Sequence, residues 1–182
     1  LGDSRLDLPN AETEAKDIAA LIPESQLLLR GKASKFAFKQ FASNFSYLHI
    51  ASHGEFNGDV PLKSRLLLAN DSADDGNLTA GDIYDLKLDA NLVTMSACET
   101  GLGHVANGDD IIGLTRALLY AGSSNVVASL WQVDDLATSL LMTAFYKNMM
   151  KGEPVRLALR NAQQSVKTRM PHPFFWAPFF VV

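Results

Sequence analysis

The chain alternates short apolar runs with stretches of helical periodicity. The apolar runs have the length of β-strands and are largely continuous rather than strictly alternating: 27–29, 47–51, 66–68, 92–95, 126–130 and 179–182. Strands that are covered on both faces have such continuous runs, whereas half-exposed strands alternate apolar and polar residues. The pattern therefore predicts a mostly parallel sheet that is buried between other elements.

Helical periodicity fills most of the sequence between these runs. Residues that favour the start of a helix occur at five places: Asn10, 79–82, 109–110, 134–135 and Pro154. The Thr-x-x-Asp sequence at 79–82 has the spacing of a capping box. Gly122 and Gly152 follow two of the predicted helices as stop signals, and Pro23 ends the first. Strands that alternate with helices predict an α/β fold with helices on both faces of the sheet.

Composition supports one globular domain over residues 1–182. The chain is 47% hydrophobic and 20% charged, which excludes a disordered or coiled-coil protein. Its net charge of −4 predicts no nucleic acid binding, and the absence of a long apolar run predicts no membrane span. Since the chain begins with Leu1 rather than Met, we expect it to be a fragment of a longer protein.

Three of the predicted strands are followed by residues that can carry chemistry. Their order is 47–52 with His53 and Gly54, 92–97 with Cys98 and Glu99, and 126–130 with 131–135. In an open parallel sheet, ligands bind beyond the carboxyl ends of the strands. A histidine and a cysteine at this edge are typical of a cysteine nucleophile with a histidine partner.

Each of these two residues has a simpler interpretation. A lone cysteine near a strand end is most often a small buried apolar residue, and a histidine that closes a strand is more often a hydrogen-bonded core residue. The joint placement of His53 and Cys98 at one edge favours the catalytic interpretation. Gly54 and Gly101 add to it, because glycine lets a substrate approach the backbone closely.

Four segments, in this order and spacing, resemble the CHAT domain: Tyr47-Leu-His-Ile-Ala-Ser-His-Gly, Leu92-Val-Thr-Met-Ser-Ala-Cys-Glu-Thr-Gly, Gly108-Asp-Asp-Ile-Ile-Gly-Leu-Thr-Arg-Ala and Val126-Val-Ala-Ser-Leu-Trp-Gln-Val-Asp-Asp. The resemblance extends from Leu8 to the final Trp176-Ala-Pro-Phe-Phe-Val. CHAT domains are caspase-like, are grouped with caspases and separases, and are often fused to tetratricopeptide repeats. The resemblance implies a caspase-like three-layer α/β/α sandwich with a mostly parallel central sheet.

The resemblance also implies a cysteine endopeptidase with His53 and Cys98 as its catalytic dyad, acting on a protein substrate. The backbone N–H groups of Gly54 and Cys98 are the expected oxyanion donors, since such donors usually lie beside the nucleophile and in a glycine turn. His53 would activate the thiol or protonate the leaving amine. The alternative is a catalytically silent caspase-like scaffold that acts by protein–protein interaction.

The substrate pocket is expected to be acidic. Several carboxylates follow the predicted strands near this edge: Glu55, Glu99, Asp109, Asp110, Asp134 and Asp135. Only Lys63 and Arg65 are nearby cations, so we expect a basic P1 residue in the substrate, bound by Asp134 or Asp135. Helix capping is an equally good interpretation of these two aspartates. Trp131 is a candidate wall of the pocket, with a core position as its alternative.

We expect no metal and no cofactor. His49 and His53 have the i,i+4 spacing of zinc ligands on a helix, but on a strand four residues span roughly 13 Å, which is too far for one ion. The glycines of residues 101–106 resemble a dinucleotide fingerprint, but no carboxylate for a ribose follows at the required distance. The family suggests a tetratricopeptide-repeat or other sensor region in the full-length chain and a cytoplasmic location.

Overall fold

The computed structural model describes residues 1–5, 8–57, 59–72, 74–96, 98–99, 109–131 and 134–182, with the backbone alone at 9, 98–99 and 109–112. Within this part of the chain, strands form two four-stranded sheets. The first has the order β1 (Tyr47–Ile50), β5 (Leu92–Met95), β7 (Val126–Ser129) and β8 (Phe179–Val181). The second has the order β4 (Asn77–Thr79), β3 (Arg65–Leu67), β2 (His53–Glu55) and β6 (Cys98–Glu99).

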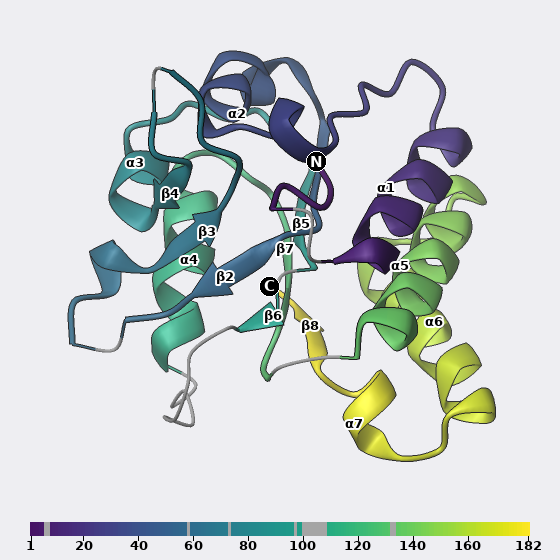
Figure 1. The fold of residues 1–182 in the computed structure, drawn as a ribbon. Helices are drawn as coiled ribbons and strands as arrows, with labels where there is room; N and C mark the ends of the chain where they lie inside the picture. The colour runs from purple at the N-terminus through teal and green to yellow at the C-terminus, as the bar shows by residue number, and fades with distance from the viewer. Residues whose placement is uncertain (6–7, 58, 73, 97, 100–108, 132–133) are drawn as a thin grey trace.

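Helices cover both faces of the first sheet, in which β1, β5 and β7 are parallel and β8 is antiparallel. Figure 1 shows α1 (Pro9–Leu21), α5 (Asp135–Met150) and α6 (Val155–Arg169) on one side, and α3 (Ala80–Tyr84) and α4 (Asp109–Tyr120) on the other. The remaining helical segments are α2 (Lys35–Phe41), α7 (Pro173–Trp176), η1 (Arg30–Lys32), η2 (Ala42–Asn44) and η3 (Pro61–Lys63). The predicted three-layer α/β/α architecture is confirmed. In the described part of the chain, no helix has the length and apolar character to cross a membrane.

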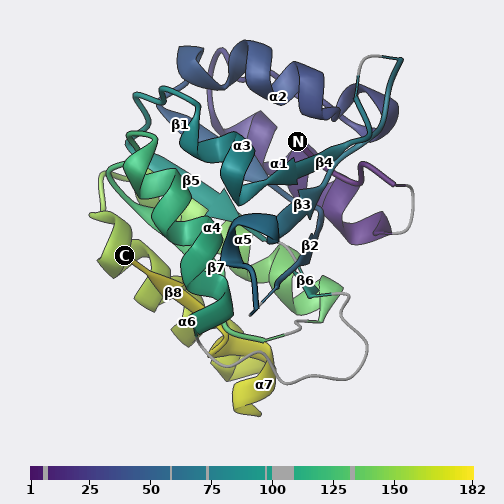
Figure 2. The same cartoon turned by 90° about the vertical axis from the view of Figure 1, so that its left-hand side faces the viewer.

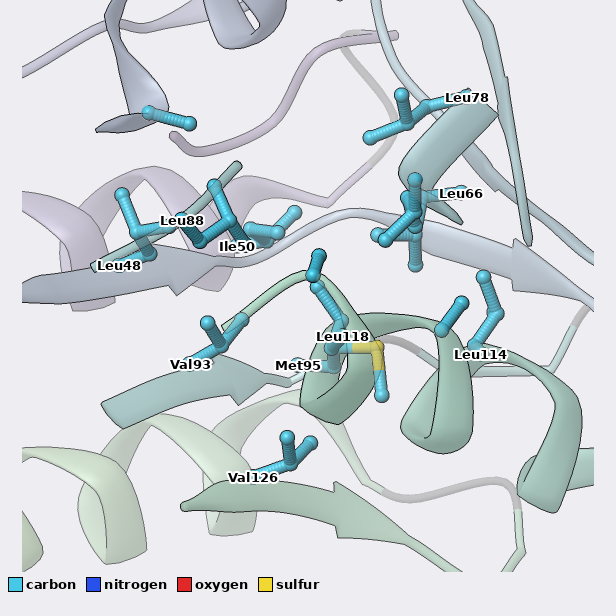
Figure 3. Packing of buried hydrophobic residues seen from close by; sticks show 14 of the residues in the cluster. Leu48, Ile50, Leu66, Leu78, Leu88, Val93, Met95, Leu114, Leu118 and Val126 are labelled. Atoms are coloured by element: carbon cyan, nitrogen blue, oxygen red, sulfur yellow. The ribbon is translucent and has the colours of Figure 1, made fainter. Parts of the chain in front are cut away.

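Neighbouring residues of one strand enter two different cores. Val93 and Val126 belong to the core beneath α4, whereas Leu92 and Val127 belong to the core beneath α5 and α6. Figure 3 shows the first core, in which side chains of β1, β5 and β7 meet those of α4. Because consecutive side chains of a strand point to opposite faces, both faces must be apolar, which explains the continuous apolar runs in the sequence.

Two predicted strands behave differently from expectation. The run at 27–29 is no strand: Leu29 forms one isolated bridge with Gly2, and Arg30 at φ +53° then turns the chain into η1. The run at 66–68 contributes to β3, which pairs antiparallel with both β2 and β4 and thus lies outside the parallel sheet. Figure 2 shows β2, β3 and β4 beside one another, away from β7.

The helix signals were mostly confirmed. Thr79 and Asp82 form both hydrogen bonds of a capping box at the start of α3. Gly122, at φ +114°, follows α4, and its backbone approaches Leu88 so closely that a Cβ would lie 2.0 Å from the Leu88 carbonyl oxygen. The prediction of Asn10 as a helix cap was wrong. Proline favours the first helical position, so α1 begins at Pro9 and its cap position is Leu8.

Candidate active site

The candidate site is built where two parallel strands continue from one sheet into the other. β1 and β5 pair over their whole length. After a short break, the segment that follows β1 forms β2, and the segment that follows β5 forms β6. β2 and β6 are again parallel, with His53 opposite Cys98 and Gly54 opposite Glu99. Neighbouring strands lie about 4.8 Å apart. The backbone therefore makes His53 and Cys98 direct neighbours, as Figure 1 shows for β2 and β6.

The N-terminal segment pairs with the end of β1 on the side away from β5. Ala51 donates its N–H to the Leu1 carbonyl at 2.8 Å, and its own carbonyl accepts from the Asp3 N–H at 3.0 Å. The pairing of β1 with β5 ends at Ile50. The chain then crosses to β3, which pairs with β2 on the side opposite β6. His53 is thus held in a central strand and is half-buried.

Only the backbone of the predicted nucleophile belongs to the described structure. The side chains of Cys98 and Glu99 lie outside it, as do Gly101 and the rest of residues 100–108. Gly54 is buried between Leu66 of β3 and Glu99 of β6. The catalytic roles of Cys98 and His53, and the oxyanion role of Gly54, remain predictions.

The two predicted pocket aspartates both bind backbone N–H groups. Oδ1 of Asp134 accepts from the Ala137 N–H at 2.8 Å and caps α5. Oδ2 of Asp135 accepts from the Asn10 N–H at 3.1 Å and thereby joins the start of α5 to the start of α1. Both side chains are half-buried. The structural interpretation of these aspartates therefore holds.

Trp131 lies on the surface rather than in the core. It is 36% exposed, and its indole Nε1 donates to the Phe174 carbonyl at 3.3 Å. This bond ties the segment after β7 to α7. A position at the rim of a pocket is compatible with this placement, whereas the core alternative is not.

The two cations near β2 differ in how far they are available to bind an acidic substrate residue. Arg65 lies opposite Glu55 in the register of β3 and β2, and its Nε donates to Glu55 Oε2 at 2.8 Å. The guanidinium is therefore already neutralised by a carboxylate on the next strand. Lys63 is exposed in η3. Of the two cations that could bind an acidic substrate residue, one is thus already paired.

Sequence reasoning missed a buried polar cluster just before the two strand ends. Glu14 of α1 is only 1% exposed and contacts His49 of β1 and Ser96, which follows β5. One signal was present in the sequence. Glu14 falls among Ala11, Ala15 and Ile18, the residues of the apolar face of α1, so its carboxylate had to be buried with them.

A cavity lies apart from this edge. It has a volume of about 440 Å³ and is enclosed by the end of α1, the following loop, α2 and the start of β1. Its wall includes Ile22, Phe41, Tyr47 and His49, but none of the residues predicted to carry the chemistry. We therefore place the candidate site at β2 and β6 and not in this cavity.

The fold defines the class of protein. The chain is similar to the crystal structure of the Arg-specific cysteine proteinase gingipain R, with a TM-score of 0.64 and 10% sequence identity. The similarity covers 96% of this chain and 41% of the gingipain chain. Together with the three-layer architecture, this likeness assigns the chain a caspase-like fold.

The family follows from the sequence. The chain belongs to the CHAT domain family, whose pattern matches residues 3–182. It is 34% identical over 134 residues to human tetratricopeptide repeat protein 28 and 35% identical over 107 residues to the mouse protein of that name. These alignments cover 72% and 58% of this chain, but only 5% and 4% of the two relatives. The chain thus corresponds to a small part of those proteins.

Proposed function

We propose that this CHAT domain is a caspase-like cysteine endopeptidase in which His53 and Cys98 form the catalytic pair. One observation carries the proposal: the two residues are register partners on the parallel strands β2 and β6. A histidine and a cysteine from distant parts of the sequence are thereby brought as close as neighbouring strands allow. β7 is parallel to β5, as β1 is, so we place the ends of three strands at one edge, where they can contribute to substrate binding.

The proposed chemistry is acyl transfer through a thioester. His53 takes the thiol proton of Cys98, and the thiolate attacks the scissile carbonyl carbon. The tetrahedral oxyanion is stabilised by the backbone N–H groups of Gly54 and Cys98. The C–N bond then breaks, and His53 returns the proton to the leaving amine. Water hydrolyses the thioester, with His53 as its base, and releases the free thiol and the new carboxyl terminus.

We further propose that the substrate carries a basic P1 residue. Arg65 is occupied by Glu55, which weakens the case for an acidic P1 residue. Asp134 and Asp135 are acidic side chains that accept backbone hydrogen bonds, and Glu99 follows Cys98 directly. The gingipain with this fold is described as Arg specific. For the present chain, the preference depends on its own acidic residues.

The regulatory setting is also a proposal. Residues 1–182 would act as one peptidase domain within a longer chain, since the chain covers only about 5% of its human relative. The name of that relative supports a tetratricopeptide-repeat region as the sensor that controls the domain. A cytoplasmic location agrees with a chain that contains a single cysteine.

Cleavage of peptides by the full-length protein tests this proposal. A library with varied P1 residues is incubated with the wild type, Cys98→Ala and His53→Ala. We expect cleavage after Arg or Lys by the wild type and a loss of at least about 1,000-fold in kcat/KM in both variants. A biological output that persists unchanged in both variants, without cleavage by the wild type, would instead establish the silent scaffold.

A further inference from the structure

A buried carboxylate lies directly behind the candidate site. Glu14 of α1 is 1% exposed, and its Oε1 accepts from the Ser96 hydroxyl at 2.6 Å and lies 2.8 Å from His49 Nε2. The His49 side chain is 9% exposed. Burial of a carboxylate is costly unless hydrogen bonds replace those to water. Both bonds converge on one oxygen of Glu14, so its position is closely defined.

The two partners of Glu14 lie on the two segments that lead to the predicted catalytic residues His53 and Cys98. His49 precedes His53 by four residues and Ser96 precedes Cys98 by two. Ser96 also donates its backbone N–H to the Ile50 carbonyl at 3.0 Å, which joins the two segments at the end of β1. Glu14 therefore joins the two strand paths immediately before β2 and β6.

Packing makes this junction rigid. The His49 ring meets the Tyr146 ring edge-on, with 5.4 Å between the ring centres. The Tyr146 hydroxyl is 3.0 Å from Thr94 Oγ1, and Thr94 is the register partner of His49 on β5. Burial raises the pKa of Tyr146, so its hydroxyl remains a protonated donor. Residues of α1, β1, β5 and α5 are thus connected in one buried cluster.

The hydrogen bonds also define the tautomer of His49. Its Nδ1 is buried and, among the described residues, has no hydrogen-bond partner. Oε1 of Glu14 already acts as an acceptor for the Ser96 hydroxyl, so it accepts from His49 as well. The proton therefore sits on Nε2 and is donated to Glu14. This assignment gives Glu14 two donors and His49 a fixed orientation.

We propose that Glu14 is a positioning residue for the His53–Cys98 pair. By binding His49 and Ser96 together, it fixes the setting of β2 relative to β6 and so the reach of the imidazole to the thiol. The inference rests on the proposed function. α1 reaches the third strand end as well, through the bond from the Asn10 N–H to Asp135, so a displacement of α1 would disturb all three segments.

Three variants distinguish an effect on the position of the catalytic groups from an effect on the stability of the fold. Glu14→Leu keeps the side-chain volume and removes both acceptors, whereas Glu14→Gln keeps an Oε1 that can accept both bonds. Ser96→Ala removes only a hydroxyl. The readouts are kcat and KM for peptide cleavage and the pH dependence of Cys98 alkylation by iodoacetamide, followed by peptide mass spectrometry in the full-length protein.

For Glu14→Leu we expect kcat to fall on the order of 100-fold with KM nearly unchanged, because misplaced catalytic groups slow the chemical step. Its alkylation profile should move towards the pH range of an ordinary thiol, whose pKa is about 8.5. Glu14→Gln should stay within a few-fold of the wild type in both readouts. Ser96→Ala should change both readouts in the same direction as Glu14→Leu, but to a smaller extent.

The outcomes distinguish the two proposals. If His53→Ala leaves the alkylation profile of Cys98 unchanged, the proposed function fails and this inference fails with it. If His53→Ala alters the profile and a folded Glu14→Leu does not, only the positioning role is overturned. Circular dichroism reports whether Glu14→Leu folds; where it does not, Ser96→Ala takes its place, and a wild-type profile in that variant overturns the inference.

Discussion

At the residue scale, Asp134 shows how a structural bond and a charge can share one side chain. Its Oδ1 caps α5 by accepting from the Ala137 N–H. An asparagine caps a helix as well as an aspartate does, but it carries no charge. The helix cap and the proposed contact of Asp134 with a basic substrate residue can therefore be separated by Asp134→Asn.

We predict that Asp134→Asn lowers kcat/KM for substrates with Arg or Lys at P1 by about tenfold, since a hydrogen bond to a charged group contributes roughly 1.5–3 kcal/mol. Its free energy of unfolding should match that of the wild type. Asp134→Ala, as the control, should also lose about 1 kcal/mol of stability with the cap. Peptide hydrolysis and urea denaturation measure the two effects. An unchanged P1 preference in Asp134→Asn would exclude this aspartate from the pocket.

The positions of single residues could be predicted from the sequence in one case and not in another. His53 and Cys98 could be paired from the sequence, because each follows an apolar run and the runs were expected to be parallel neighbours. Glu14 could not be paired with its partners. Its burial follows from helical spacing, but its contact with Ser96 depends on how α1 lies across the sheet, which no local pattern encodes.

At the scale of elements, the short helix α3 depends on the charges at its start. Asp82 accepts from the Thr79 N–H at 3.0 Å and forms ion pairs with Lys35 at 3.0 Å and Lys39 at 2.7 Å. Burial alone would raise the pKa of Asp82. Hydrogen bonds from Lys39, Thr79 and Lys35 outweigh burial and hold this pKa far below its usual range.

The depressed pKa of Asp82 predicts a pH-dependent stability. The unfolded chain binds this proton at about pH 3.9, so the stabilisation is present above that pH and is lost as the pH falls towards the lower pKa of the folded state. We expect Asp82→Asn to lower the free energy of unfolding by about 1–2 kcal/mol at pH 7, with a smaller difference below about pH 4. Denaturation at several pH values measures it.

The exposed Asp89 provides the control for that series. Asp89→Asn should change the free energy of unfolding by no more than about 0.5 kcal/mol at any of these pH values. A difference between Asp82→Asn and the wild type that stays constant from pH 7 to pH 3 would show that the carboxylate charge does not support α3.

At the scale of the whole molecule, the three-layer architecture could be predicted and the second sheet could not. Continuous apolar runs identify buried strands, because β5 and β7 need apolar residues on both faces. The same runs do not show whether a strand is parallel or antiparallel to its neighbours. β3 resembles the other strands in composition, yet it pairs antiparallel with β2, because only a short connection of residues 56–64 separates the two.

Long-range pairing also explains why the run at 27–29 does not form a strand. Leu29 is apolar enough for a strand, but its β-pairing is an isolated bridge with Gly2. A bridge of one residue does not extend into a ladder. The N-terminal segment also pairs with the end of β1, since Ala51 binds Leu1 and Asp3. Both features depend on where the N-terminal segment lies in the folded molecule, which periodicity does not report.

The most direct measurement of the central claim is the covalent capture of Cys98 by a substrate-like peptide. The full-length protein is incubated with a peptidyl acyloxymethyl ketone that carries arginine at P1, and the modified peptide is identified by mass spectrometry. Our account predicts a single adduct on Cys98 that forms much faster in the wild type than in His53→Ala. Capture at equal rates in both proteins, or no capture of Cys98 in the wild type, would contradict it.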